Sequence, residues 1–295
     1  MAVKLPTTKN VDMYTAKMYP DLWTGGNPKG AIIHNDAGRM SATDYVTWLK
    51  NARTPNTSKA ELGFANYYID RNNIVRVATT TIGGYAAANP YYNKNFLHYE
   101  VCQQLGANDA DWLANERAVF MQVAEDFHYY GLKASKDTIV LHHDVSRNGT
   151  SCPQRSMQTH GGNYPAVRQY FINQVAYYMS LGKTVKDMVS ALNKAQNTTV
   201  TTSKPTTNTS TGIVKKYAEK GVFYPNETII VRDAPTTKAN IVTRYFKGEN
   251  LTYHTVNIGN GYVWLEYLRN NGKSGFIPIR EYKGGKFGKL WGTIK

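Results

Sequence analysis

Gly30-Ala-Ile-Ile-His34 is a short, uninterrupted apolar run that ends in a histidine. A run of this length without polar alternation is typical of a strand buried on both faces of a sheet. Thr138-Ile-Val-Leu141 has the same character and leads directly into His142 and His143. The two runs predict buried strands that bring imidazole groups to the rim of a sheet, where sites on α/β scaffolds are usually built.

Helix and hairpin signals surround these strands. Ser41-x-x-Asp44 has the form of a capping box that starts a helix. Residues 110–130 and 165–181 are apolar-periodic stretches that each end at a glycine, as long helices do. Residues 64–70 and 74–78 predict the two strands of a hairpin. Strands mixed with long helices predict an α/β domain in which helices cover a sheet.

Residues 197–212 stand apart from the rest of the chain. Eight of these sixteen residues are threonine. Such a stretch has almost no apolar surface to bury and cannot offset the entropy lost on ordering. We therefore expect a flexible linker at 197–212 that joins a first domain, 1–196, to a second, 213–295.

The second domain has a different character from the first. Short β-rich runs, such as 228–232 and 262–265, are separated by turns at Gly259-Asn-Gly261 and Asn270-Asn-Gly272. Closely spaced strands with such turn residues indicate an all-β fold. We expect a small barrel or sandwich here.

The composition excludes several classes of protein. The chain has 295 residues, of which 41% are hydrophobic, too many for a disordered chain. No window approaches the ~18 consecutive apolar residues of a membrane span. The N-terminal Met-Ala-Val-Lys-Leu-Pro has no apolar signal region, so we expect synthesis in a cytoplasm without a signal peptide. Two cysteines, Cys102 and Cys152, are too few for a disulfide scaffold.

The charge of the chain is strongly positive. The formal net charge is +14, and residues 213–295 hold fourteen basic and six acidic side chains, a net charge of +8. A basic module favours a polyanionic partner: nucleic acid, an acidic membrane surface or an anionic cell wall. The plainer alternative is that the lysines only keep the protein soluble.

His34, His142 and Cys152 are the side chains best suited to chemistry. Cys152 follows His142 by ten positions, in a polar loop. Two imidazoles and one thiolate suit zinc and leave a fourth position open, as in catalytic sites. On an extended chain His143 would face away from His142, so only one of them would look at the metal. From spacing alone, two hydrogen-bonded histidines and an inert thiol remain the more common outcome.

Four segments carry a family resemblance: Ala31-Ile-Ile-His34, Tyr67-Tyr-Ile-Asp-Arg71, Leu97-His-Tyr-Glu100-Val-Cys102, and Leu141-His-His-Asp-Val145 followed by Ser151-Cys-Pro153. In this order they resemble the type 2 N-acetylmuramoyl-L-alanine amidases of phages and bacteria, over roughly residues 25–180. The resemblance implies a central mixed β-sheet covered by helices, with one zinc ion per chain. It assigns the zinc ligands to His34, His142 and Cys152, and the acid/base role near the metal-bound water to Glu100.

The chain departs from this family at two places. Many relatives have Trp-His-Ala where this chain has Tyr85-Ala-Ala87, so a substrate contact from that histidine is missing. Many also place a lysine two residues before the last ligand, where this chain has Thr150. The Thr150 hydroxyl can donate a hydrogen bond to the oxyanion but brings no positive charge. We therefore expect Thr150 to be a catalytic residue beside Glu100, with more of the transition-state stabilisation left to zinc.

The second domain carries a resemblance of its own, on the segments Thr228-Ile-Ile-Val-Arg-Asp-Ala-Pro235, Gly261-Tyr-Val-Trp-Leu-Glu-Tyr267, Gly275-Phe-Ile-Pro-Ile-Arg280 and Leu290-Trp-Gly-Thr-Ile-Lys295. These resemble a bacterial SH3 domain of the type carried by cell-wall hydrolases, which implies an SH3-like barrel that binds peptidoglycan stems and cross-bridges. Tyr253, Phe276 and Trp291 are candidates to line a groove for a Gly-rich or small-residue peptide. The alternative for each is a place in the core.

Both resemblances together predict an endolysin-like peptidoglycan hydrolase. It would cleave the amide bond between N-acetylmuramic acid and L-alanine with a zinc-activated water. Its expected partners are peptidoglycan and anionic wall polymers, without nucleic acid or membrane insertion. It would be made in the host cytoplasm and act on the wall after release.

Two alternatives remain open on sequence grounds. One is a cysteine-dependent amidase or endopeptidase with Cys102 or Cys152 as the nucleophile, which would need no metal. The other is a non-catalytic wall adhesin or nucleic-acid binder that depends on the positive charge.

Overall fold

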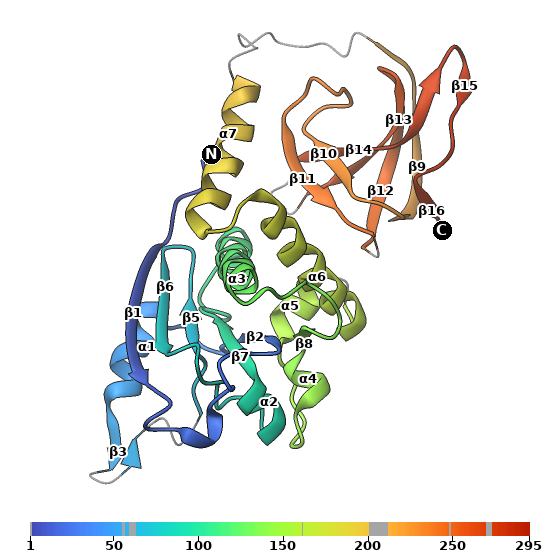
Figure 1. The fold of residues 1–295 in the computed structure, drawn as a ribbon. Coiled ribbons are helices and arrows are strands. Elements are labelled where there is room, and N and C mark those ends of the chain that lie inside the picture. Colours follow the sequence, from blue (N-terminus) through green and yellow to red (C-terminus); the bar gives the residue numbers. More distant parts are fainter. Residues whose placement is uncertain are drawn as a thin grey trace. The chain divides into compact units, whose positions relative to one another are not determined.

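The chain divides into two compact units, Met1–Asn193 and Lys194–Lys295. A computed structural model describes residues 2–54, 57–58, 63–160, 162–200, 212–247, 249–269 and 273–295 (Figure 1). Helix α7 (Val185–Val200) continues four residues into the segment expected to be a linker. Residues 201–211 of that segment lie outside the described residues, so the linker stays a prediction. No helix among the described residues is long and apolar enough to cross a membrane.

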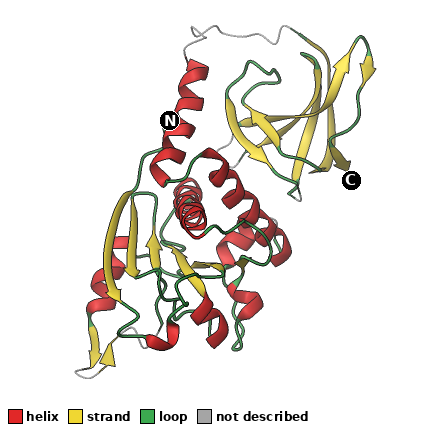
Figure 2. Ribbon diagram, in the orientation of Figure 1, coloured by secondary structure: helices red, strands yellow, loops and turns green. Residues whose placement is uncertain are grey.

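The first unit is an α/β structure (Figure 2). Its elements, in chain order, are β1 (Thr7–Tyr14), the 3-10 turn η1 (Pro20–Leu22), β2 (Gly30–Asn35), α1 (Ala42–Lys50), β3 (Ala52–Thr54), β4 (Thr57–Ser58), β5 (Tyr67–Ile69), β6 (Asn73–Ala78), α2 (Pro90–Asn95), β7 (Phe96–Val101), α3 (Asp109–Tyr130), β8 (Ile139–Val140), α4 (His142–Val145), α5 (Gln154–Thr159), α6 (Tyr164–Leu181) and α7. Six strands form one sheet in the order β1-β6-β5-β7-β2-β8. The pair β5–β6 is antiparallel and the other neighbours are parallel. The predicted mixed sheet with helices is therefore confirmed.

The helices begin and end where the sequence signals lie. At the start of α1, the Ser41 hydroxyl accepts from the Asp44 backbone N–H, and the Asp44 carboxylate accepts from the Ser41 N–H. Helix α3 ends at Gly131, whose φ of 66° lies in the left-handed region that glycine adopts without strain. These local contacts satisfy backbone groups that a helix terminus leaves without partners.

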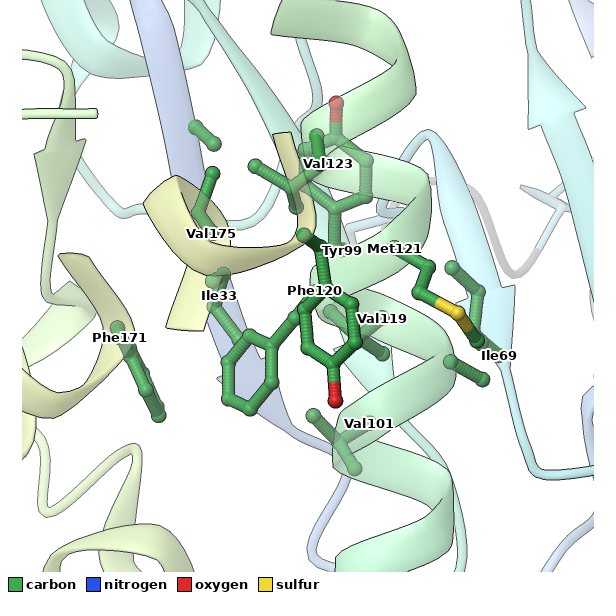
Figure 3. Close-up of a cluster of buried hydrophobic side chains, with 14 of the residues drawn as sticks. Ile33, Ile69, Tyr99, Val101, Val119, Phe120, Met121, Val123, Phe171 and Val175 are labelled. Atoms are coloured by element: carbon green, nitrogen blue, oxygen red, sulfur yellow. The ribbon is translucent and has the colours of Figure 1, made fainter. Parts of the chain in front are cut away.

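The two faces of the sheet have different chemistry. Strands β2 and β7 run parallel in register, with Ile33 beside Tyr99 and His34 beside Glu100. Successive side chains of a strand point to opposite faces. Ile33 and Tyr99 belong to the core that helices α3 and α6 cover, where they meet Phe120 (Figure 3). His34 and Glu100 therefore lie together on the opposite face.

The second unit is an all-β structure, as predicted, formed by one curled eight-stranded sheet (Figure 1). Its strands are β9 (Ile213–Pro225), β10 (Ile229–Arg232), β11 (Ile241–Tyr245), β12 (Leu251–Gly259), β13 (Tyr262–Leu268), β14 (Ser274–Lys283), β15 (Lys286–Phe287) and β16 (Gly292–Ile294). Their order is β11-β10-β14-β13-β12-β9-β16, with β15 paired to β14. Asn260 and Gly261, both at positive φ, make the predicted turn between β12 and β13. The other predicted turn, 270–272, lies outside the described residues.

Candidate metal centre

The structure brings His34, His142 and Cys152 together. One nitrogen or sulfur atom of each lies within 4.8 Å of the others. His34 Nδ1 is 3.2 Å from His142 Nδ1 and 3.8 Å from Cys152 Sγ. His34 lies more than a hundred residues from His142 and Cys152 in sequence, so the fold brings it to the other two donors.

The ends of two neighbouring strands place the histidines. His34 is the fifth residue of β2, and β8 pairs with β2 in parallel just before His142 begins α4. The extended chain expected at His142 and His143 is wrong, because α4 starts at His142. His143 still faces elsewhere: its ring stacks on Tyr164 with centroids 3.5 Å apart, and its Nδ1 lies 2.9 Å from Asp144 Oδ1.

The donor set fits zinc in number, chemistry and spacing. Zinc–nitrogen bonds of ~2.0–2.1 Å and a zinc–sulfur bond of ~2.3 Å, at tetrahedral angles, place two nitrogens about 3.3 Å apart and a nitrogen and a sulfur about 3.6 Å apart. The distances at His34 are 3.2 Å to nitrogen and 3.8 Å to sulfur. The backbone N–H of Asn35 also donates to Cys152 Sγ at 3.4 Å, a contact that favours negative charge on sulfur.

Burial sets the protonation of the three groups. It lowers the pKa of His34 well below its usual value, and the neighbouring His98 and His142 add to the shift. It also lowers the pKa of His142. Both imidazoles are therefore neutral at pH 7 and can offer a lone pair. Burial, followed by the charge of Glu100, raises the pKa of the Cys152 thiol above its usual range, so this group must lose a proton on binding a metal.

Glu100 lies beside the cluster on β7. Its Oε2 atom is buried and has no hydrogen-bond partner among the residues that the structure describes. Burial, and then the charge of Asp36, raises the pKa of Glu100 to about 8. A carboxyl group with a pKa near neutrality suits proton transfer. The hydroxyl oxygen of Thr150 accepts the Cys152 backbone N–H at 3.1 Å, so Thr150 orders the loop that carries the sulfur.

The sequence interpretation missed His98, which is fully buried next to His34. His98 Nδ1 lies 3.0 Å from His34 Nε2, and His98 Nε2 lies 3.3 Å from the Tyr92 carbonyl oxygen. Burial lowers the pKa of His98 to about 3. A signal for this residue was available, because His98 stands two positions before Glu100 on one strand and so shares its face.

A second missed group ties the Cys152 loop to β2. The Asn35 side chain bonds Ser156 twice: its Nδ2 donates to Ser156 Oγ, and its Oδ1 accepts from the Ser156 backbone N–H, each at 3.0 Å. Ser156 Oγ donates to the buried Glu116 carboxylate at 2.6 Å, and His160 Nε2 lies 2.7 Å from its other oxygen. This network fixes α5, which Pro153 joins to Cys152.

The three aromatic residues predicted to line a groove lie in different settings. Phe276 lines a pocket of about 390 Å³ in the second unit, together with Lys215, Lys216 and Asn257. Tyr253 is 1% exposed within the core, and its hydroxyl donates to a carboxylate on β9. Trp291 is half-buried beside the ring of Tyr262. Of the three, Phe276 alone lines this pocket.

Comparison with known proteins supports both resemblances found in the sequence. Residues 24–155 match the family model of N-acetylmuramoyl-L-alanine amidases, and residues 215–279 match that of bacterial SH3 domains. Endolysin PlyTW of Staphylococcus phage Twort is 31% identical, over 92% of this chain and 60% of the relative. Endolysin LysK of Staphylococcus phage K is also 31% identical, over 92% of this chain and 59% of the relative.

The chain thus spans about three fifths of the length of these curated relatives. Among solved structures, the cell wall binding domain of the staphylococcal phage 2638A endolysin is 31% identical and is matched over 27% of this chain and 90% of that chain, with a TM-score of 0.26. The chain carries an N-acetylmuramoyl-L-alanine amidase domain followed by a bacterial SH3 domain, and its homologues include staphylococcal phage endolysins.

Proposed function

We propose that this chain is a peptidoglycan hydrolase that cleaves the amide bond between N-acetylmuramic acid and L-alanine. The observation that carries the proposal is the meeting of His34, His142 and Cys152 beside the buried carboxyl of Glu100, within an amidase domain. His34 Nδ1, the His142 imidazole and Cys152 Sγ would hold the metal. Zinc, when bound there, supplies a Lewis acid that polarises a carbonyl and acidifies water.

Glu100 would move the protons of the reaction. Its unpartnered Oε2 takes a proton from the attacking water and later gives it to the nitrogen of the leaving L-alanine. The surrounding burial keeps bulk water from competing for that oxygen. The Thr150 hydroxyl accepts from the Cys152 N–H, and its own hydrogen remains able to donate to the oxygen that gains negative charge.

A cysteine nucleophile is less well supported. Burial raises the pKa of both thiols, so neither is a thiolate at neutral pH, the form that attacks a carbonyl. Cys102 is also fully buried. A chelator separates the two mechanisms, because cysteine catalysis would survive removal of the metal.

We further propose that the second unit holds the enzyme on the bacterial wall. The pocket beside Phe276 offers an apolar ring, the Asn257 amide and two lysines, a combination suited to a small-residue peptide with polar backbone groups. The net charge of +8 over residues 213–295 would add attraction to anionic wall polymers. Action on the wall would follow release from the host cell in which the chain is made.

The test combines product chemistry with metal analysis. Mass spectrometry of fragments from digested walls should show free L-alanine amino termini and intact muramic acid, and the purified protein should contain about one zinc per chain. Cys152→Ser should lose both zinc and lysis. New termini elsewhere in the stem or cross-bridge would disprove the proposed bond, and full lysis after rigorous chelation would disprove the role of zinc.

A further inference from the structure

We propose that His98 is a positioning residue that holds His34 in the one tautomer able to bind metal through Nδ1. The inference rests on the proposed function, since it concerns zinc at His34. We expect His98 to affect the affinity for zinc and the tautomer of the His34 ring.

A chain of hydrogen-bond contacts runs from the Tyr92 carbonyl through the rings of His98 and His34 to the cluster. The Tyr92 carbonyl oxygen lies 3.3 Å from His98 Nε2, and His98 Nδ1 lies 3.0 Å from His34 Nε2. On the far side of its ring, His34 Nδ1 faces His142 and Cys152. The tautomer of each ring therefore depends on the contact before it in this chain.

The proton positions follow from the first link. A carbonyl oxygen can only accept, so His98 Nε2 carries the hydrogen. The neutral ring then leaves His98 Nδ1 as an acceptor, and the facing His34 Nε2 must donate to it. His34 Nδ1 is left with a free lone pair, directed at the other two donors. In the opposite tautomer, His34 Nδ1 would carry a hydrogen and could not bind a metal.

Packing holds the His98 ring in this orientation. The side chain is fully buried, and its backbone N–H donates to Asn66 Oδ1 at 2.9 Å. Gly84 lies against the ring: a Cβ atom at residue 84 would come within 2.5 Å of His98 Cγ. The rings of His98 and His34 are nearly parallel, with centroids 5.2 Å apart. These contacts hold the His98 ring with Nδ1 directed at His34 Nε2.

Nitrogen-15 NMR of histidine-labelled wild-type protein tests the tautomers without any substitution. Spectra with and without zinc should show His98 protonated at Nε2 in both states, and His34 protonated at Nε2 with zinc at Nδ1 in the loaded state. A hydrogen on His98 Nδ1, or zinc at His34 Nε2, would overturn the inference.

Matched variants measure the effect on affinity. His98→Leu removes the acceptor and should weaken zinc binding about 10- to 100-fold in chelator competition. His98→Asn keeps an amide oxygen near the position of ring Nδ1 and should restore most of that loss. His128→Leu is the control, because His128 bonds the Met179 carbonyl of the same unit and does not touch the cluster.

The outcomes separate this inference from the proposed function. Equal zinc affinity in wild type, folded His98→Leu and His98→Asn would disprove the positioning role while leaving the metal centre intact. The same loss in His98→Asn and His98→Leu would also disprove it, since the acceptor would then not matter. Wild-type protein that binds no zinc, or Cys152→Ser protein that binds it normally, would instead disprove the proposed centre.

Discussion

Zinc binding at pH 7 should release about two protons, one from Cys152 and one from Glu100. His34 and His142 contribute none, because their lowered pKa values leave both rings neutral before the metal binds. The Cys152 thiol is fully protonated and must give up its proton to become a ligand. Glu100, with a pKa of about 8, is roughly nine-tenths protonated at pH 7 and ionises when a cation lies beside it.

The proton count fixes the pH dependence of affinity. Each released proton makes the apparent association constant rise about tenfold per pH unit, so the wild-type value should rise almost 100-fold per unit around pH 7. Above pH 8 Glu100 is already ionised, and the slope should fall toward tenfold. In Glu100→Gln protein only the thiol remains, and the slope should be about tenfold throughout.

Calorimetric titration of metal-free protein with zinc, in buffers of different ionisation enthalpy, counts the protons directly. Wild type should release about two and Glu100→Gln about one at pH 7. Release of about one proton by wild type and none by Glu100→Gln would mean that Cys152 is not a ligand or is already a thiolate. Equal release by both proteins would mean that Glu100 keeps the same ionisation state when the metal binds, and would refute its assigned share of the protons.

Three further outcomes are expected. Glu100→Gln should keep its zinc while turnover of soluble muropeptide falls by ~10²–10⁴, the usual loss of a general acid/base; near-normal turnover would move that role to another residue. Residues 213–295 alone should bind whole cells without lysing them; this binding should weaken in high salt, and Phe276→Ala should weaken it by about 1–3 kcal/mol. Residues 1–196 alone should lyse cells more slowly than the full chain. Equal lysis rates at every salt concentration would refute the targeting role. Burial raises the pKa of Asp126 to about 7, so its carboxyl is neutral in the folded state below that pH. The free energy of unfolding should therefore fall by an amount on the order of a few kcal/mol as pH rises from about 4 to 7, and Asp126→Asn should abolish this decrease. The same pH dependence of the free energy of denaturant unfolding in both proteins would refute the assignment.

Much of the fold was predictable because its signals are local. The capping box at Ser41 and the glycine at 131 mark helix ends through contacts within a few residues. Strand β1 was not predicted, since Thr7–Tyr14 is largely exposed and carries no apolar run. Its pairing with β6, more than sixty residues away, is decided by tertiary contacts that no local pattern records.

The candidate site divides in the same way. The family resemblance assigned the candidate zinc ligands. Residue spacing alone favoured two hydrogen-bonded histidines and an inert thiol over a zinc site. The network of Asn35, Ser156 and Glu116 could not be predicted, because it joins three elements whose meeting depends on the whole fold. The sequence could not tell which aromatic residues line a groove. Tyr253 and Phe276 both lie on strands, but the Tyr253 ring fills the core and the Phe276 ring lines a pocket.

The alternation of side chains along β7 explains why two of its residues, His98 and Glu100, both lie beside the candidate metal centre. Neighbouring parallel strands in register place paired residues on the same face, so the partner of His34, Glu100, lies beside it. The residue two positions earlier, His98, shares that face and reaches the other ring nitrogen of His34. Between them, Tyr99 points into the core that α3 covers. A strand packed on its core face thus fixes both Glu100, proposed to move protons, and His98, proposed to orient a ligand, and small shifts of β7 should disturb the two together.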